Sequence, residues 1–133
     1  MLHALGGAIT RRGSIYLKHR VEFDQVIKAK FFVVLEDYEE GMENIIIAFT
    51  TSRTEFAYRD TTVLVERGVF EEFSDSTLIE LNNYREISIE DLFSSGCKYI
   101  GQLPENIMQE VDEAIEHLQD VDEVTWFRMI GIS

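Results

Sequence analysis

The chain has 133 residues, a formal net charge of −13, 45% apolar residues and a single cysteine. This length suits one domain, and the apolar fraction is that of a globular protein, which excludes extensive disorder. One cysteine cannot form an internal disulfide or a cysteine zinc cluster. The longest apolar runs, residues 31–35 and 45–49, are far shorter than the roughly 20 residues of a membrane-spanning helix. We therefore expect a soluble, cytoplasmic protein, and its negative charge argues against broad nucleic-acid binding.

The charge is divided unevenly along the chain. Residues 1–35 contain six basic and two acidic side chains, a net charge of +4, whereas residues 36–133 contain six basic and 23 acidic ones, a net charge of −17. A basic segment on an acidic body indicates an anionic partner for that segment. The alternative is that these basic residues pair with acidic neighbours within the fold.

The first predicted elements follow a short lead-in. Residues 1–12 contain two adjacent glycines and little pattern, which indicates a flexible lead-in, and no repeat or linker divides residues 13–133, which read as a single domain. Short β-rich or continuous apolar runs then predict strands over residues 14–18, 30–35 and 44–50. The acidic residues 36–43 include Gly41 and are typical of a hairpin connection.

Further short strands are predicted in the second half of the chain, over residues 61–65, 76–81, 85–89 and 97–100. Asn82 and Asn83 are of the type that favours turns, so we expect a turn between the second and third of these strands. A short helical turn is expected to follow Ser88 and to run through Phe93.

The strongest helix prediction covers residues 104–118. Pro104 suits a first helical position, and apolar side chains recur at helical spacing at Ile107, Met108, Val111, Ile115 and Leu118. A second short helix is predicted over residues 122–130. About six or seven short strands followed by a C-terminal helix predict a mainly β protein with α, built as a small, strongly bent sheet or barrel.

Signatures of common enzyme classes are absent from the sequence, including phosphate-binding loops, nucleophile elbows and metalloprotease motifs. His19 follows a predicted strand among Lys18, Arg20 and Lys28, where it could act as a general acid or base, and the alternative is an ordinary surface histidine. The acidic residues 36–43 do not match a calcium-binding loop. We expect no metal site and no cofactor.

One segment carries a more specific signal for anion binding. Residues Thr50, Thr51, Ser52, Arg53 and Thr54 close the most apolar predicted strand with four hydroxyls and a guanidinium. Lys30 opens the preceding apolar strand, so an antiparallel pairing of the two strands brings it to the same end of the sheet. Hydroxyls and cations in one place can bind a phosphate through directed hydrogen bonds. The alternative is a strand end that only makes turn hydrogen bonds.

The order of these segments resembles the PemK/MazF-like toxin family. Gly13–Leu17 is similar to the family's opening strand, Lys30–Leu35 stands where the family shows R-P-x-[VL]-V-[IL], and Ala48–Ser52 stands where a strand ends in P-[IL]-T-[TS]. Residues 76–79 match a small-residue segment that leads into a strand, and residues 98–115 resemble the closing signature of a glycine, a leucine and a helix. Residues 20–29 differ from the family's usual loop as an inserted stretch. The resemblance covers roughly residues 13–118.

The resemblance implies a small SH3-like barrel with a C-terminal helix and a metal-independent endoribonuclease that cleaves single-stranded RNA. It also implies a homodimer that an antitoxin neutralises. In the family, an arginine opening the second strand and a threonine or serine closing the next carry the chemistry, and these positions match Lys30, Thr50 and Thr51. Because Lys30 lacks the two parallel donors of an arginine, Arg53 is the candidate that takes over charge stabilisation. The candidate substrate-binding residues are Lys18, His19, Arg20, Lys28 and Ser52.

A second function, from a different class, stays open. The lysine in place of arginine and the acidic body also suit a non-catalytic barrel that acts as a protein-interaction module, a degenerate toxin homologue. In that case the apolar tail matters, since it either packs on the barrel or contacts a second subunit or partner. Its apolar residues are Val124, Trp126, Phe127, Met129 and Ile130.

Overall fold

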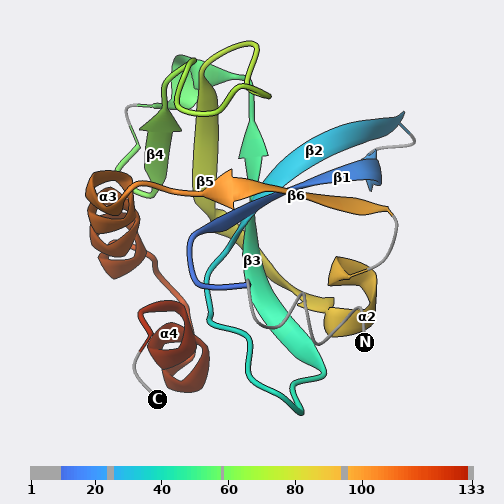
Figure 1. Ribbon diagram of the computed structural model, residues 1–133. Helices are drawn as coiled ribbons and strands as arrows, with labels where there is room; N and C mark the ends of the chain where they lie inside the picture. The colour runs from blue at the N-terminus through green and yellow to red at the C-terminus, as the bar shows by residue number, and fades with distance from the viewer. Residues whose placement is uncertain (1–9, 24–25, 58, 94–95, 132–133) are drawn as a thin grey trace.

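A computed structural model describes residues 10–23, 26–57, 59–93 and 96–131, and it shows one curled sheet flanked by helices (Figure 1). The sheet has six antiparallel strands in the order β4-β5-β3-β2-β1-β6, so that β4 and β6 are its edges. The strands are β1 (Ser14–Phe23), β2 (Val26–Val34), β3 (Asn44–Thr51), β4 (Thr62–Val65), β5 (Thr77–Ser88) and β6 (Cys97–Gln102). This curled half-barrel confirms the prediction of a small, mainly β fold with a C-terminal helix.

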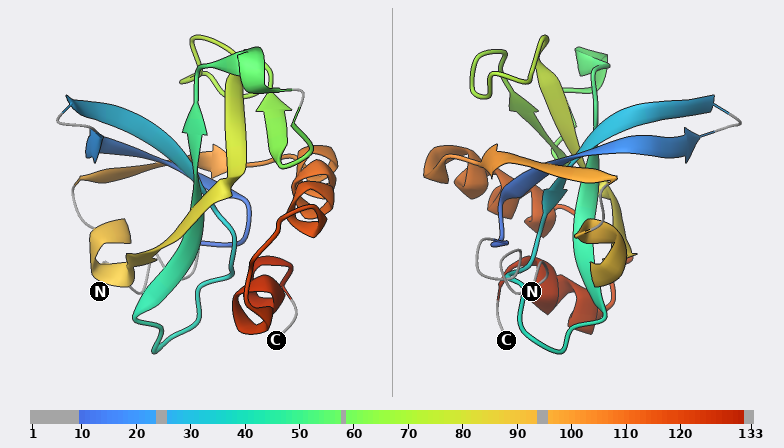
Figure 2. Two further views of the ribbon diagram at one scale, coloured as in Figure 1. Left: turned by 180° about the vertical axis from the view of Figure 1, so that it is seen from behind. Right: turned by 45° about the vertical axis from the view of Figure 1, so that its right-hand side comes forward.

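The helices lie on opposite sides of the sheet. A 3-10 turn, η1 (Thr54–Phe56), follows β3, and the helices are α2 (Ile89–Leu92), α3 (Glu105–Glu116) and α4 (Glu123–Met129). The two views of Figure 2 show α3 and α4 one below the other on one side, while α2 lies across the sheet near the start of β3. All three helical segments predicted from the sequence are therefore confirmed to within a few residues at their ends.

Both faces of the central strands are buried, which explains why their sequences are continuously apolar. Ile46 and Ala48 of β3 face one cluster, which also contains Val111 and Ile115 of α3 and Met129 of α4. Their neighbours in β3 face the other cluster, formed with β1, β2 and α2 by Tyr16, Phe32, Ile45, Ile47, Phe49 and Leu92. The sheet thus separates two small cores, and its strands are fixed from both sides.

One sequence prediction about a connection is wrong. Asn82 and Asn83 form no turn, because β5 runs without a break from Thr77 to Ser88. Its pairing with β3 shifts register between Ala48 and Thr50, so β5 absorbs extra residues by bending rather than by turning. The inserted residues 20–29 are mostly strand, since β1 and β2 stay paired up to Phe23 and Val26 and form an arm that projects from the sheet (Figures 1 and 2).

Residues near both ends of the described chain pack onto the barrel. Met129 is fully buried, and Trp126 and Ile130 pack against the same core, whereas Val124 is 71% exposed and Phe127 37% exposed. The tail therefore covers the chain's own core with part of its apolar residues. At the other end, the hydroxyl of Thr10 lies 2.6 Å from the phenol oxygen of Tyr16. The earlier part of the predicted lead-in, residues 1–9, lies outside the described residues.

Candidate functional site

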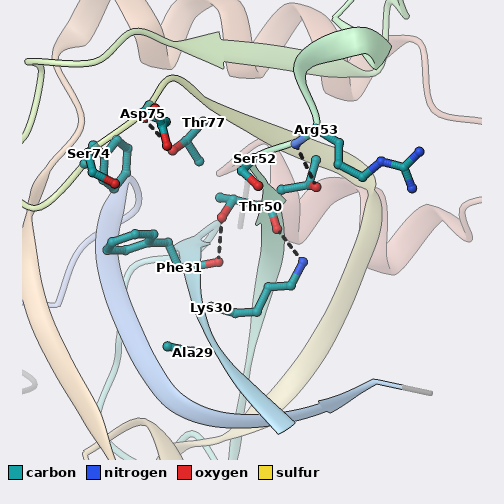
Figure 3. A pocket seen from close by; sticks show the side chains of 11 residues that line it. Ala29, Lys30, Phe31, Thr50, Ser52, Arg53, Ser74, Asp75 and Thr77 are labelled. Carbon is teal, nitrogen blue, oxygen red and sulfur yellow. Dashed lines mark hydrogen bonds between the residues drawn. The ribbon is translucent and has the colours of Figure 1, made fainter. Parts of the chain in front are cut away.

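The candidate site lies where strand β2 leaves strand β3, a place we call the strand fork. β3 pairs with β2 only from Phe32 to Val34, and beyond this point β2 continues along β1 while the end of β3 pairs with β5. The two strands therefore diverge and open a pocket between them (Figure 3). The residues that line it are Ala29, Lys30, Phe31, Thr50, Thr51, Ser52, Arg53, Phe73, Ser74, Asp75 and Thr77.

Lys30 and Thr50 join the two sides of the strand fork, as the sequence predicted. The ammonium Nζ of Lys30 donates a hydrogen bond of 3.0 Å to the backbone oxygen of Thr50, and Figure 3 shows the lysine side chain extending from β2 towards β3. The hydroxyl of Thr50 donates in the opposite direction, to the backbone oxygen of Phe31 at 3.0 Å. Thr50 is 3% exposed. Because its hydroxyl proton is already donated to Phe31, only the lone pairs of the hydroxyl remain for a further contact.

Thr51, Ser52 and Arg53 form the rim of the pocket on the β3 side. The backbone N–H of Arg53 donates to the hydroxyl of Thr51 at 3.2 Å, which fixes the chain as it leaves β3. The Arg53 guanidinium lies largely in solvent and contacts the Glu55 carboxylate at 2.9 Å. The pKa of Glu55 lies below its usual value because of a hydrogen bond from its own backbone N–H and another from Arg53. An exposed pair of this kind is weak, so Arg53 can exchange Glu55 for another anion.

The opposite wall of the pocket was not found by sequence reasoning. It comes from the connection between β4 and β5, which supplies Phe73, Ser74 and Asp75, followed by Thr77 at the start of β5. Phe73 is buried and holds this wall against β2, since its ring lies 4.5 Å from the ring of Phe31. The signal in the sequence is the pair Phe70 and Phe73, two large aromatic residues within a mostly polar connection.

The predicted substrate-binding residues other than Ser52 lie on the paired strands β1 and β2. Lys18 of β1 pairs directly with Lys30 of β2, so it lies beside the strand fork. His19 and Arg20 lie in an irregular part of β1, and Lys28 pairs with Val21, but the side chains of His19, Arg20 and Lys28 lie outside the described part of the structure. The structure thus places Lys18, Lys30 and the end of β3 together.

Arg12, which also belongs to the basic segment of residues 1–35, has a structural role instead. Its guanidinium donates to the backbone oxygens of Leu35 and Met129 and pairs with Asp112 at 2.6 Å. For Arg12, pairing with an acidic neighbour within the fold is therefore the correct interpretation. Among the described basic side chains of this segment, Arg12 makes such contacts, while Lys18 and Lys30 lie at the strand fork.

Other kinds of site find little support. Among the described residues, no group of three or more histidine, cysteine, aspartate or glutamate side chains is arranged to hold a metal ion. Within the same ranges, no helix combines the length and the apolar character needed to span a bilayer. What the pocket offers is a lysine, an arginine and several hydroxyls on adjoining strands, the donors that bind a phosphate group.

Two comparisons with known proteins bear on the identity of the chain. A search of curated proteins found no match to the chain. The model of one protein family, described as the PemK-like, MazF-like toxin of type II toxin-antitoxin systems, matches residues 11–118. The match includes all six strands and helix α3, and it ends before α4. The chain therefore belongs to the PemK-like, MazF-like toxin family of type II toxin–antitoxin systems.

Proposed function

We propose that the pocket at the strand fork binds a phosphate of single-stranded RNA and promotes cleavage of the chain at that phosphate. One observation carries this proposal, the 3.0 Å hydrogen bond from Lys30 Nζ to the backbone oxygen of Thr50. This bond fixes a cation beside the hydroxyls of Thr51 and Ser52, which line the same pocket. A positioned cation with hydroxyl donors suits the negative charge that develops at phosphorus during cleavage.

The reaction follows from the chemistry of RNA itself. The 2′-hydroxyl loses its proton and its oxygen attacks the adjacent phosphorus, while the bond from phosphorus to the 5′-oxygen of the next nucleotide breaks and that oxygen takes up a proton. The products are a 2′,3′-cyclic phosphate and a free 5′-hydroxyl, and no metal ion is needed as a reactant. Lys30 and Arg53 would stabilise the extra negative charge, and the hydroxyls of Thr51 and Ser52 would donate to the non-bridging oxygens.

Thr50 and His19 have more limited parts in this proposal. Because the Thr50 hydroxyl already donates to Phe31, it would contribute by holding the strand fork in shape and by accepting a hydrogen bond from the substrate. His19 is the candidate for proton transfer, on the strength of its place in the sequence.

Family membership supports a protein partner for this chain. A type II antitoxin is itself a protein, and a segment of it that presents a carboxylate to Lys30 and Arg53 would compete with RNA for the pocket. We propose in addition that the chain acts as a homodimer in the cytoplasm.

A second candidate function is binding without cleavage. The observation that favours it is the state of Thr50, whose hydroxyl is buried and already bonded to a backbone oxygen. The lysine at position 30 also presents a single charged group where an arginine would present two parallel donors. Such a site would bind a phosphate or a carboxylate without breaking any bond of the bound molecule.

One assay separates the two functions. Purified protein is incubated with labelled single-stranded RNA in EDTA, and the products are separated on a denaturing gel. Cleavage by the wild type, together with a roughly 100-fold or larger loss in Lys30→Ala, would support catalysis at the strand fork. Lys98→Ala is the matched control, since Lys98 is an exposed lysine of β6 that does not line the pocket. Intact RNA after exposure to a range of sequences would reject catalysis and leave the binding function.

A further inference from the structure

A row of side chains connects the strand fork to the β6 edge of the sheet. Lys18 of β1 lies directly opposite Lys30 of β2, and on its other side it lies opposite Cys97 of β6. Tyr16, two residues before Lys18, lies opposite Tyr99 of β6. Residues that are directly opposite in antiparallel strands share a face, and so do residues two apart in one strand. Lys30, Lys18 and Tyr99 therefore lie on one face, across three adjacent strands.

Two like charges lie directly opposite each other in this row. A lysine facing a lysine across an antiparallel pair is unfavourable, because their charges repel at close range. Within the described ranges, Lys18 forms no ion pair with an acidic side chain. An anion bound beside the pair would remove this repulsion, and the proposed phosphate site at Lys30 lies one strand away, about 5 Å across the sheet.

Tyr99 gives this face an exposed aromatic ring. It is 39% exposed, whereas Tyr16, opposite it in β1, is 3% exposed. The rings of Tyr99 and Tyr16 meet at an interplanar angle of 69° with centroids 5.5 Å apart, so the contact is edge to face rather than stacked. Tyr16 in turn stacks on Phe32 at 5.6 Å, which fixes the ring that supports Tyr99. Tyr99 is thus a supported ring at a sheet edge, partly open to solvent.

We propose that Lys18 and Tyr99 bind the nucleotide next to the phosphate in the strand fork, with Lys18 on its phosphate and Tyr99 stacked on its base. A charged side chain followed by an aromatic ring at the spacing of neighbouring strands is the usual means of binding single-stranded nucleic acid. This inference rests on the proposed RNA substrate, and it assigns a direction to the RNA path, from the strand fork across β1 to β6.

The test measures binding separately from cleavage. The probe is a labelled RNA oligonucleotide whose 2′-hydroxyls are replaced by fluorine, so that it cannot be cleaved, and a set of the same oligonucleotides with one base removed at each position in turn. We expect Tyr99→Ala to weaken binding of the intact probe by about tenfold and to have no effect on the probe that lacks the stacked base. Tyr99→Phe should bind like the wild type, because stacking needs only the ring.

Lys18 is tested through the salt dependence of the same binding. Lys18→Ala should reduce the slope of log affinity against log salt concentration by about 0.7, the value for one phosphate contact on a single strand. Lys98→Ala provides the control, because Lys98 lies opposite Leu17 on the other face of the same strands. A slope that falls equally in both variants would show that Lys18 acts only through net charge, and would overturn its assignment.

The remaining outcomes separate this inference from the proposed function. If Tyr99→Ala binds every probe as the wild type does while the wild type cleaves RNA, the inference is wrong and the nuclease proposal stands. If Tyr99→Ala weakens binding of the intact and all base-lacking probes equally, Tyr99 has a structural or protein-binding role and the inference is also wrong. If Tyr99→Ala weakens binding only of probes that keep the stacked base, and the wild type cleaves no RNA, the RNA path is confirmed and catalysis is rejected.

Discussion

Arg128 of α4 binds Glu36, just beyond β2, through two parallel hydrogen bonds, from Nε to Oε1 at 2.7 Å and from Nη2 to Oε2 at 2.9 Å. Glu36 is 8% exposed, and its Oε2 also accepts the backbone N–H of Ile46 at 2.8 Å. The hydrogen bond to Glu36 is the largest cause that raises the pKa of Arg128 above its usual value. The family match ends at residue 118, so this contact attaches α4, which lies beyond the matched residues, to the barrel.

We expect Glu36→Ala to destabilise the protein by about 3 kcal/mol, because it leaves the Arg128 charge without its main partner and the Ile46 N–H without an acceptor. Urea unfolding followed by tryptophan fluorescence measures the free energy directly, since Trp126 lies in α4. Glu86→Ala is the matched control, because Glu86 also bonds Arg128, at 2.6 Å, but is half exposed and should cost at most about 1 kcal/mol. Equal losses in both variants would contradict the importance of the buried pair.

Gly101 of β6 allows the opposite wall of the pocket, formed by the β4–β5 connection, to approach the sheet. A Cβ at this position would lie 2.8 Å from Cε1 of Phe70, and the Phe70 ring packs on that of Phe73, which lines the pocket. Gly101→Ala should therefore displace this wall, destabilise the protein by about 1–3 kcal/mol and weaken oligonucleotide binding. Thermal unfolding and fluorescence anisotropy measure the two effects.

The double variant Gly101→Ala with Phe70→Leu tests whether the clash with Phe70 is the cause. A smaller side chain at position 70 makes room for the new methyl group, so the double variant should lose less stability than the sum of the two single variants. Additive losses would show that Gly101 is needed for another reason, such as the backbone conformation of β6.

Tyr16 gives the protein's stability a dependence on alkaline pH. Burial raises the pKa of Tyr16 above its usual value of 10.0, and this effect exceeds the lowering by its hydrogen bond with Thr10. The unfolded chain therefore releases this proton at a lower pH than the folded one. The contribution of Tyr16 to stability is fully present well below pH 10.0 and is lost as the pH rises above it.

Tyr16→Phe should remove this part of the alkaline loss, at the cost of about 1 kcal/mol at neutral pH for the hydrogen bond to Thr10. Urea unfolding midpoints at a series of pH values, from neutral to above the ordinary tyrosine pKa, measure the effect. The same decline with pH in Tyr16→Phe and the wild type would show that other groups cause the alkaline unfolding.

The sequence was sufficient to predict the half of the site that lies on β2 and β3. The apolar runs identified both strands, and antiparallel pairing was enough to bring Lys30 to Thr50, as the hydrogen bond between them confirms. The roles of Lys30, Thr50, Thr51 and Arg53 in catalysis stay predictions. So do the substrate contacts of Lys18, His19, Arg20, Lys28 and Ser52.

The other half of the site could not be predicted, because it depends on contacts between distant residues. The β4–β5 connection has no periodic pattern, and its place is set by Phe73 packing on Phe31, far away in the sequence. Asn82 and Asn83 have turn propensity, but pairing on β3 keeps β5 continuous around them, so tertiary hydrogen bonds override the local preference.

Lys30 stands where the family has an arginine. A lysine Nζ offers one charged centre, and here it already donates to the backbone oxygen of Thr50. An arginine at position 30 could keep that bond with one nitrogen and direct another towards a phosphate oxygen. We therefore expect Lys30→Arg to cleave single-stranded RNA several-fold faster than the wild type under single-turnover conditions, while Lys30→Ala loses roughly 100-fold or more. Lys98→Arg, on the opposite face of β6, should match the wild type. A Lys30→Arg variant as inactive as Lys30→Ala would instead show that the pocket accepts only the slimmer ammonium group.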